Sequence, residues 1–95
     1  MLLLIDDVQF RTKETFLEFI SRSFGKGSDG INDIESLKKA VNERGSEEIE
    51  FVFYDFEEIV DEVKDFANEV VSAILDCRIA NQQISVVYRN GADGI

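Results

Sequence analysis

Residues Ile49–Tyr54, with the sequence IEFVFY, decide the fold of this 95-residue chain. All but one of them are aromatic or β-branched, and apolar side chains occur at both alternating sets of positions. This pattern is typical of a strand covered on both faces, so we expect it to be the central strand of a sheet. Two further runs predict strands, Leu2–Ile5 before it and Ile84–Tyr88 after it. The first is also apolar on both faces, which predicts that it too is covered on both sides.

A first helix is expected between the first two strands, over residues 13 to 24. Thr12 stands where an N-cap belongs, and Gly25 ends the helical pattern. The apolar residues that recur at helical spacing are Phe16, Leu17, Ile20 and Phe24. The following residues 26–31 include two glycines and predict an irregular, exposed loop.

A second helix is expected after this loop, because Asn32 and Glu35 have the spacing of a capping box. Gly45 closes the helix. Its predicted buried stripe consists of Ile34, Leu37 and Val41.

A third helical pattern begins at Phe56 and carries apolar residues on one side and acids on the other. More than twenty residues is long for one helix in a small domain, so a break near Asp65 would give two shorter helices. The acidic face consists of Glu57, Glu58, Asp61, Glu62, Asp65 and Glu69, and Asp76 closes the series.

Helical crossovers between consecutive strands imply parallel pairing and right-handed connections. We therefore predict a single α/β domain over residues 1–89, with a three-stranded parallel sheet packed against three or four helices. The hydrophobic content of 44% and the eight Phe can fill one core. The polar stretch from Asn90 to Gly94 predicts that residues 90–95 form a disordered tail.

The composition excludes several function classes. The chain has no His, a single Cys and no glycine-rich phosphate loop, so we expect neither an enzyme nor a cofactor or metal site. One thiol cannot form an intramolecular disulfide, which makes the cytoplasm the default location. The apolar run Leu2–Ile5 is too short for a signal core or a membrane span. The net charge of -10 would repel nucleic acid.

The charge is unevenly distributed along the chain. Residues 1–45 carry eight acids and seven bases, whereas residues 46–95 carry twelve acids and three bases. An acidic excess of this kind either serves only solubility or attracts a basic partner.

Three segments resemble one known family. The step Glu35-Ser36-Leu37 follows a glycine-containing loop, the strand Ile49–Phe53 is followed by an aromatic at Phe56, and Asp76-Cys77 precedes the closing strand. In this order and spacing the chain resembles the barstar family of bacterial ribonuclease inhibitors, from about residue 2 to residue 87. The resemblance implies a two-layer fold with strand order 1-2-3.

The resemblance also implies a function. Family members bind a basic ribonuclease inside the cell that makes it, one inhibitor to one enzyme, and place carboxylates where the enzyme holds RNA phosphates. We therefore expect an immunity protein or antitoxin with no cofactor. The implied partner-binding residues are Asp29, Gly30, Asn32, Asp33, Glu35, Lys38, Lys39 and Asp76.

The chain departs from the family at two places. Lys38 and Lys39 stand where relatives have an aromatic and a second acid, and Ser28 and Asp29 stand where a Tyr is expected. A Lys facing the cations of a nuclease would repel them rather than mimic a phosphate. A non-inhibitory acidic protein-binding module of the same fold is therefore the alternative function.

Structural roles compete with binding at each acidic site. Glu35 can cap the second helix as well as contact a partner. Asp29 and Asp33 suit ordinary loop and helix-start chemistry. The acidic face over residues 57–69 is either a solvated surface or a second surface for a basic partner. Cys77 is expected to be a small buried residue rather than a redox centre.

Overall fold

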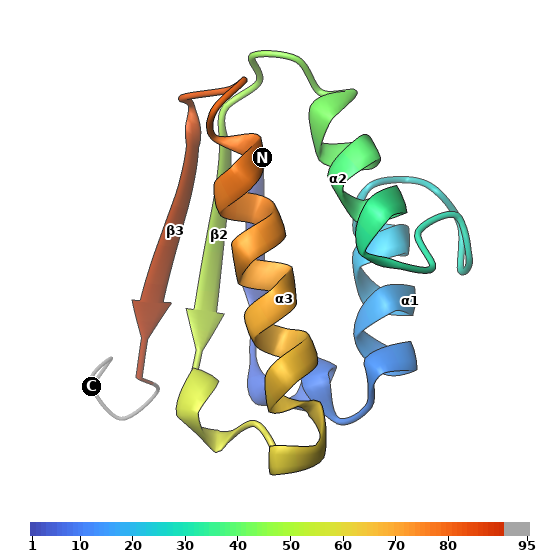
Figure 1. Ribbon diagram of the computed structural model, residues 1–95, viewed down its shortest axis with the longest axis vertical. Helices are drawn as coiled ribbons and strands as arrows, with labels where there is room; N and C mark the ends of the chain where they lie inside the picture. Colours follow the sequence, from blue (N-terminus) through green and yellow to red (C-terminus); the bar gives the residue numbers. More distant parts are fainter. Residues whose placement is uncertain (91–95) are drawn as a thin grey trace.

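The computed structural model describes residues 1–90 and has an α/β fold with a three-stranded parallel sheet (Figure 1). The strands lie in the order β1-β2-β3, so the predicted fold class and central strand are confirmed. The strands are β1 (Leu2–Ile5), β2 (Ile49–Tyr54) and β3 (Ile84–Arg89). The helices are α1 (Lys13–Ser23), α2 (Ile34–Asn42) and α3 (Asp61–Cys77), with short 3-10 helices η1 (Asp7–Phe10) and η2 (Phe56–Glu58).

The helices cover only one face of the sheet. Leu3 and Ile5 of β1 point toward them and are buried, whereas Leu2 and Leu4 are 59% and 53% exposed. The prediction that β1 is covered on both faces is therefore wrong. Both crossovers are right-handed and advance in the same direction from β1 to β3, so both place their helices on the same side.

The buried side chains form one cluster between the sheet and the helices. Its centre is aromatic, because the rings of Phe10 and Phe16 stack at 4.3 Å between centroids and Phe66 meets both edge-on. Phe51 and Phe53 enter this cluster from β2 and are 0% and 1% exposed. These phenylalanines serve as core residues, as the periodicity predicts.

The start of α2 differs from the prediction by one residue. Asp33, not Asn32, is the N-cap, and its Oδ1 accepts a hydrogen bond of 2.7 Å from the backbone N–H of Ser36. The Ser36 hydroxyl accepts in return from the backbone N–H of Asp33 at 3.1 Å. Glu35 therefore lies one position too early for the capping role and is exposed in the first turn.

The break in the third helical segment is also displaced. The segment divides at Val60, which has extended backbone angles, and α3 continues without interruption through Asp65. The η2 turn begins after Asp55, whose φ of 54° is left-handed. An Asp tolerates that region better than most residues, so the chain bends there without Gly or Pro.

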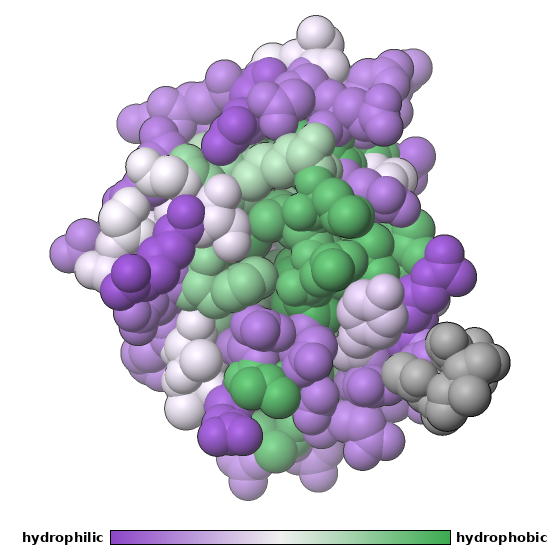
Figure 2. All heavy atoms as spheres, turned by 180° about the vertical axis from the view of Figure 1, so that it is seen from behind, coloured by the Kyte–Doolittle hydropathy of each residue, from purple (hydrophilic) through white to green (hydrophobic). Residues whose placement is uncertain are grey.

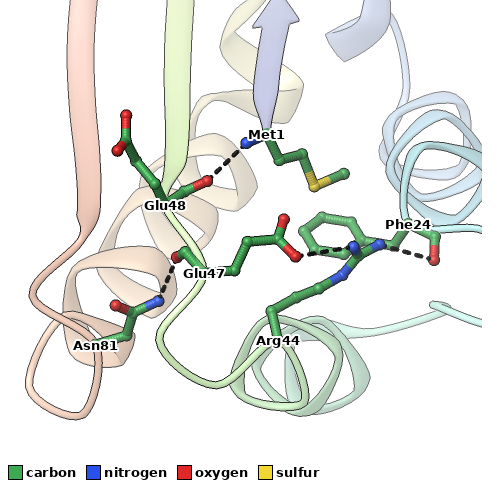
Figure 3. Close-up of polar contacts among 6 residues, drawn as sticks. All are labelled: Met1, Phe24, Arg44, Glu47, Glu48 and Asn81. Carbon is green, nitrogen blue, oxygen red and sulfur yellow. Dashed lines mark hydrogen bonds and ion pairs between the residues drawn. The ribbon is translucent and has the colours of Figure 1, made fainter.

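Polar contacts join the connections at the start of the strands (Figure 3). The terminal amino group of Met1 donates to the backbone carbonyl of Glu48 at 2.6 Å. Nδ2 of the buried Asn81, after α3, donates to the Glu47 carbonyl at 2.8 Å. The guanidinium of Arg44 pairs with the Glu47 carboxylate at 3.4 Å and donates to the Phe24 carbonyl at 3.4 Å. The loops before β2 and β3 are thus fixed to each other and to the end of α1.

The predicted tail begins at Asn90, which follows β3 and is exposed, and the rest of it lies outside the described residues. Within residues 1–90, no helix has both the length and the apolar character that crossing a membrane requires.

Candidate functional site

A groove between α2 and α3 places acidic side chains of α3 next to a basic side chain of α2. It encloses about 390 Å³. Ile34 and Lys38 line it from α2, and Asp65, Asn68, Glu69, Ser72, Ala73 and Asp76 line it from α3. The α3 residues follow the helical spacing of three and four, so they form one stripe along the helix. Three carboxylates and one ammonium group therefore face the groove.

Lys38 and Asp76 are brought together as an ion pair across this groove. Lys38 Nζ lies 3.7 Å from Asp76 Oδ2, and the two side chains are 34% and 63% exposed. A pair with this much solvent contributes about 0–1 kcal/mol to stability. The ammonium group is therefore directed at a carboxylate of its own chain and is held there only weakly.

Glu35 and Lys39 lie on the side of α2 beyond the groove. They line a separate depression of about 450 Å³ with Lys38, Asn42 and Glu43. Glu43 pairs with Lys26 at 3.1 Å, which links the end of α2 to the loop that precedes this helix. Lys38 thus separates the two depressions, and Lys39 faces only the outer one.

Asp29 and Gly30 are exposed in the loop and line neither depression. The loop is anchored next to them, because the buried Ile31 donates its backbone N–H to the Ser21 hydroxyl at 3.0 Å. Gly30 is required for steric reasons, because a Cβ at this position would overlap the carbonyl oxygen of Lys26.

Asn32 and Asp33 have local structural roles at the start of α2. Asn32 donates its backbone N–H to the Ser36 hydroxyl at 3.0 Å. The backbone and side-chain hydrogen bonds from Ser36 lower the pKa of Asp33 below its ordinary value. Asp33 is therefore an N-cap carboxylate, exposed to solvent, beside the groove residue Ile34.

Six residues that line the groove are not in the predicted partner site, and four of them are polar: Asp65, Asn68, Glu69 and Ser72. The two acids were predicted as part of a separate acidic face over residues 57–69, whereas the structure places them beside Lys38 and Asp76. The sequence did contain a signal for this placement. Asp65 and Glu69 precede Asp76 by eleven and seven residues, and residues at these spacings lie on the same side of a helix. The other predicted acids of that face, Asp61 and Glu62, are exposed in the first turn of α3.

A third cavity, of about 500 Å³, lies at the carboxyl ends of β2 and β3. Glu57 and Glu58 line it with Asp55, Phe56, Tyr88, Arg89 and Asn90. Partial burial raises the pKa of the Tyr88 hydroxyl, so this group stays neutral at physiological pH.

Cys77 is buried at the end of α3, as predicted, and its Sγ lies 3.9 Å from the Lys38 carbonyl. Burial raises the pKa of this thiol, although nearby Lys38 acts in the opposite direction. A buried thiol with little thiolate is a packing residue rather than a nucleophile. Within the described part of the chain, no group of three potential ligands is placed to hold a metal ion.

Comparisons with protein-family models, with curated proteins and with solved structures find no match to this chain.

Proposed function

We propose that the groove between α2 and α3 binds a basic protein, and that the chain is a cytoplasmic inhibitor of a basic ribonuclease, acting one to one and without a cofactor. The observation that carries this proposal is the convergence of Asp65, Glu69 and Asp76 on one groove. The resemblance of the sequence to the barstar family supports it. A cleft that holds RNA phosphates with Arg and Lys would accept these carboxylates in their place.

Rigid placement makes the carboxylates suitable for this role. All three project from α3, a 17-residue helix whose inner face is buried against the sheet. A partner therefore does not have to order a loop before it gains charge-assisted hydrogen bonds. The net charge of -10 would also accelerate the encounter with a basic partner.

Lys38 does not block this mode of binding. A partner cation that reaches Asp76 must displace the Lys38 ammonium, which costs at most about 1 kcal/mol because the pair is exposed. A hydrogen bond between charged groups in a dry interface contributes about 1.5–3 kcal/mol. The exchange is therefore favourable, and the released Lys38 side chain is long enough to turn toward solvent.

The experiment is capture of partners from the native host, followed by a ribonuclease assay in which the chain is titrated against the captured enzyme. The decisive variant neutralises the groove (D65N/E69Q/D76N), and its matched control neutralises three acids outside it (E57Q/D61N/E62Q). Both raise the net charge equally. We expect inhibition to weaken at least about 100-fold in the groove variant and only a few-fold in the control.

Two results contradict the proposal. Equal losses in the two variants would mean that only the overall negative field matters, and a captured partner set without ribonuclease activity would remove the predicted target. Light scattering of the purified complex measures the one-to-one composition independently.

An acidic binding module that does not inhibit a nuclease is the second candidate. Lys39 favours it, because this exposed base lies on the outer side of α2, where a surface that mimics phosphate would present an acid. The candidates separate in the same assay. A partner that binds through the groove while any catalytic activity it has stays unchanged supports the module and excludes the inhibitor.

A further inference from the structure

The face of the sheet opposite the helices is apolar and uncovered (Figure 2). Side chains alternate along a strand, so the paired register identifies the residues on this face. We call it the sheet face; it consists of Leu2, Leu4, Glu50, Val52, Tyr54, Ser85, Val87 and Arg89. Leu2 and Leu4 are more than half exposed. A continuous apolar patch with polar residues around it is typical of an interaction surface.

The apolar residues form a row across all three strands. Leu4, Val52 and Val87 occupy the same level of the register. Val52 in the middle is only 5% exposed because its neighbours shield it, so the row is closely packed at its centre. Such a surface can meet another sheet at the ordinary spacing of about 10 Å.

The sheet face carries one acid and one base, and the two lie too far apart to form an ion pair within one copy. Glu50 lies at the level of Ser85, whereas Arg89 lies at the level of Tyr54. The two are four residues apart along the strands, which is about 13 Å. Neither forms an ion pair with another described residue, so each is available to an opposite charge from another molecule.

A second copy supplies both charges. Consider a two-fold axis that runs across the strands, along the row of Leu4, Val52 and Val87. It makes the strands of the two sheets antiparallel. It also places Glu50 of each copy beside Arg89 of the other. The Leu4, Val52 and Val87 row then meets the same row of the second copy. A two-fold axis parallel to the strands would instead place Glu50 against Glu50.

We propose that a second copy of this chain covers the sheet face in this antiparallel arrangement. A basic partner would gain no net attraction from this face, because the face carries one acid and one base, and an anionic lipid surface offers no cation for Glu50. The helical groove of the proposed function lies on the other side of the sheet, so the two proposals stand independently.

The size of the sheet face sets the strength of the expected dimer. Three strands about 4.8 Å apart and four to six residues long cover roughly 14 by 18 Å. This is about 250 Å² on each copy and about 500 Å² for the pair, so the contact is small and belongs with weak, transient ones. We therefore expect weak association, with a dissociation constant on the order of 100 µM or above. Added salt should tighten it by screening the repulsion between two acidic copies.

Sedimentation velocity of the purified chain, from roughly 1 µM to 1 mM, measures this equilibrium directly. We expect a shift from monomer to dimer in that range, and removal of the dimer in Leu4→Lys. Leu2→Lys repeats the test at a second exposed site, so that a folding defect in one variant does not decide the outcome. The matched control is Ile79→Lys, because Ile79 is 85% exposed and lies outside the sheet face.

Charge reversal tests the antiparallel arrangement. Glu50→Arg and Arg89→Glu should each weaken association at least tenfold, and the double reversal should restore it. A wild-type chain that stays monomeric up to the highest concentration overturns the proposal. So does a dimer that both lysine variants leave unchanged, or a double reversal that associates no better than the single ones.

Discussion

Replacement of Asn81 by Ala removes a side chain that joins the two connections leading into β2 and β3. Its Nδ2 donates to the Glu47 carbonyl at 2.8 Å, and its Oδ1 accepts from the backbone N–H of Gln83 at 2.9 Å. Asn81 is 5% exposed, so these bonds are largely shielded from water. Each contributes about 0.5–1.5 kcal/mol net, and a carbonyl left without a partner adds to the loss. We expect Asn81→Ala to lower the free energy of unfolding by about 2–3 kcal/mol.

Urea denaturation followed by circular dichroism measures this loss, which should lower the midpoint by about 1–2 M. The control is Gln82→Ala, at an exposed neighbouring position, which should stay within about 0.5 kcal/mol of wild type. Asn81→Asp adds a second signature, because a carboxylate oxygen would face the Glu47 carbonyl. That contact raises the pKa of the introduced group, so its stability should recover as the pH falls through this raised value. An Asn81→Ala midpoint equal to that of Gln82→Ala would refute the reasoning.

Three further outcomes follow from the site geometry. Hydrogen bonds from Ser36 lower the pKa of Asp33 in the folded chain. The stabilisation that the Asp33 carboxylate gives the fold is therefore present above its unfolded pKa of about 3.8 and is lost as the pH falls through the lower folded pKa. The difference in unfolding free energy between wild type and Asp33→Ala, measured in urea, should shrink in acid. Cys77 should react with a thiol reagent far more slowly in the folded chain than in denaturant, since burial raises its pKa; equal rates would contradict the packing role. Gly30→Ala should cost about 1–3 kcal/mol in urea denaturation, because the new Cβ meets the Lys26 carbonyl, whereas Asp29→Ala should change little.

The sequence was sufficient for the element order because each signal was local. Apolar runs such as Ile49–Tyr54 predicted strands, and helical periodicity in both intervals predicted parallel pairing. The uncovered face of the sheet was not visible in the same pattern, since Leu2 and Leu4 are as apolar as the buried Leu3. The helices cover one particular face because both crossovers have the same handedness, which the apolar pattern of a strand does not encode.

Errors at the helix ends arose where neighbouring residues compete for one role. Asn32 and Asp33 are both good N-caps, and Ser36 rather than Glu35 supplied the reciprocal hydrogen bond. The break at Val60 had no Gly or Pro to mark it. These choices differ by about the energy of one hydrogen bond, which a sequence pattern does not resolve.

The candidate groove was predictable only in part. Helical spacing alone puts Asp65, Glu69 and Asp76 on one side of α3, but the packing of α2 against α3 determines that Lys38 faces them and Lys39 does not. The pairing of Lys38 with Asp76 joins residues 38 positions apart, so no local pattern contains it. The functional assignment of the groove remains a prediction.

The one-sided helical layer has a consequence for assembly. The helices lie on one side of the sheet (Figure 1) and the sheet face lies on the other (Figure 2), so two copies joined back to back would present their grooves outward in opposite directions. Such a pair would be bivalent: it could hold two basic molecules at once, or bind a target with two basic sites more tightly than either groove does alone. Substitutions on the sheet face should then leave the intrinsic affinity of each groove for its partner unchanged. Any effect of such a substitution on partner binding would arise because the two copies are no longer linked, not because contacts in the groove have changed.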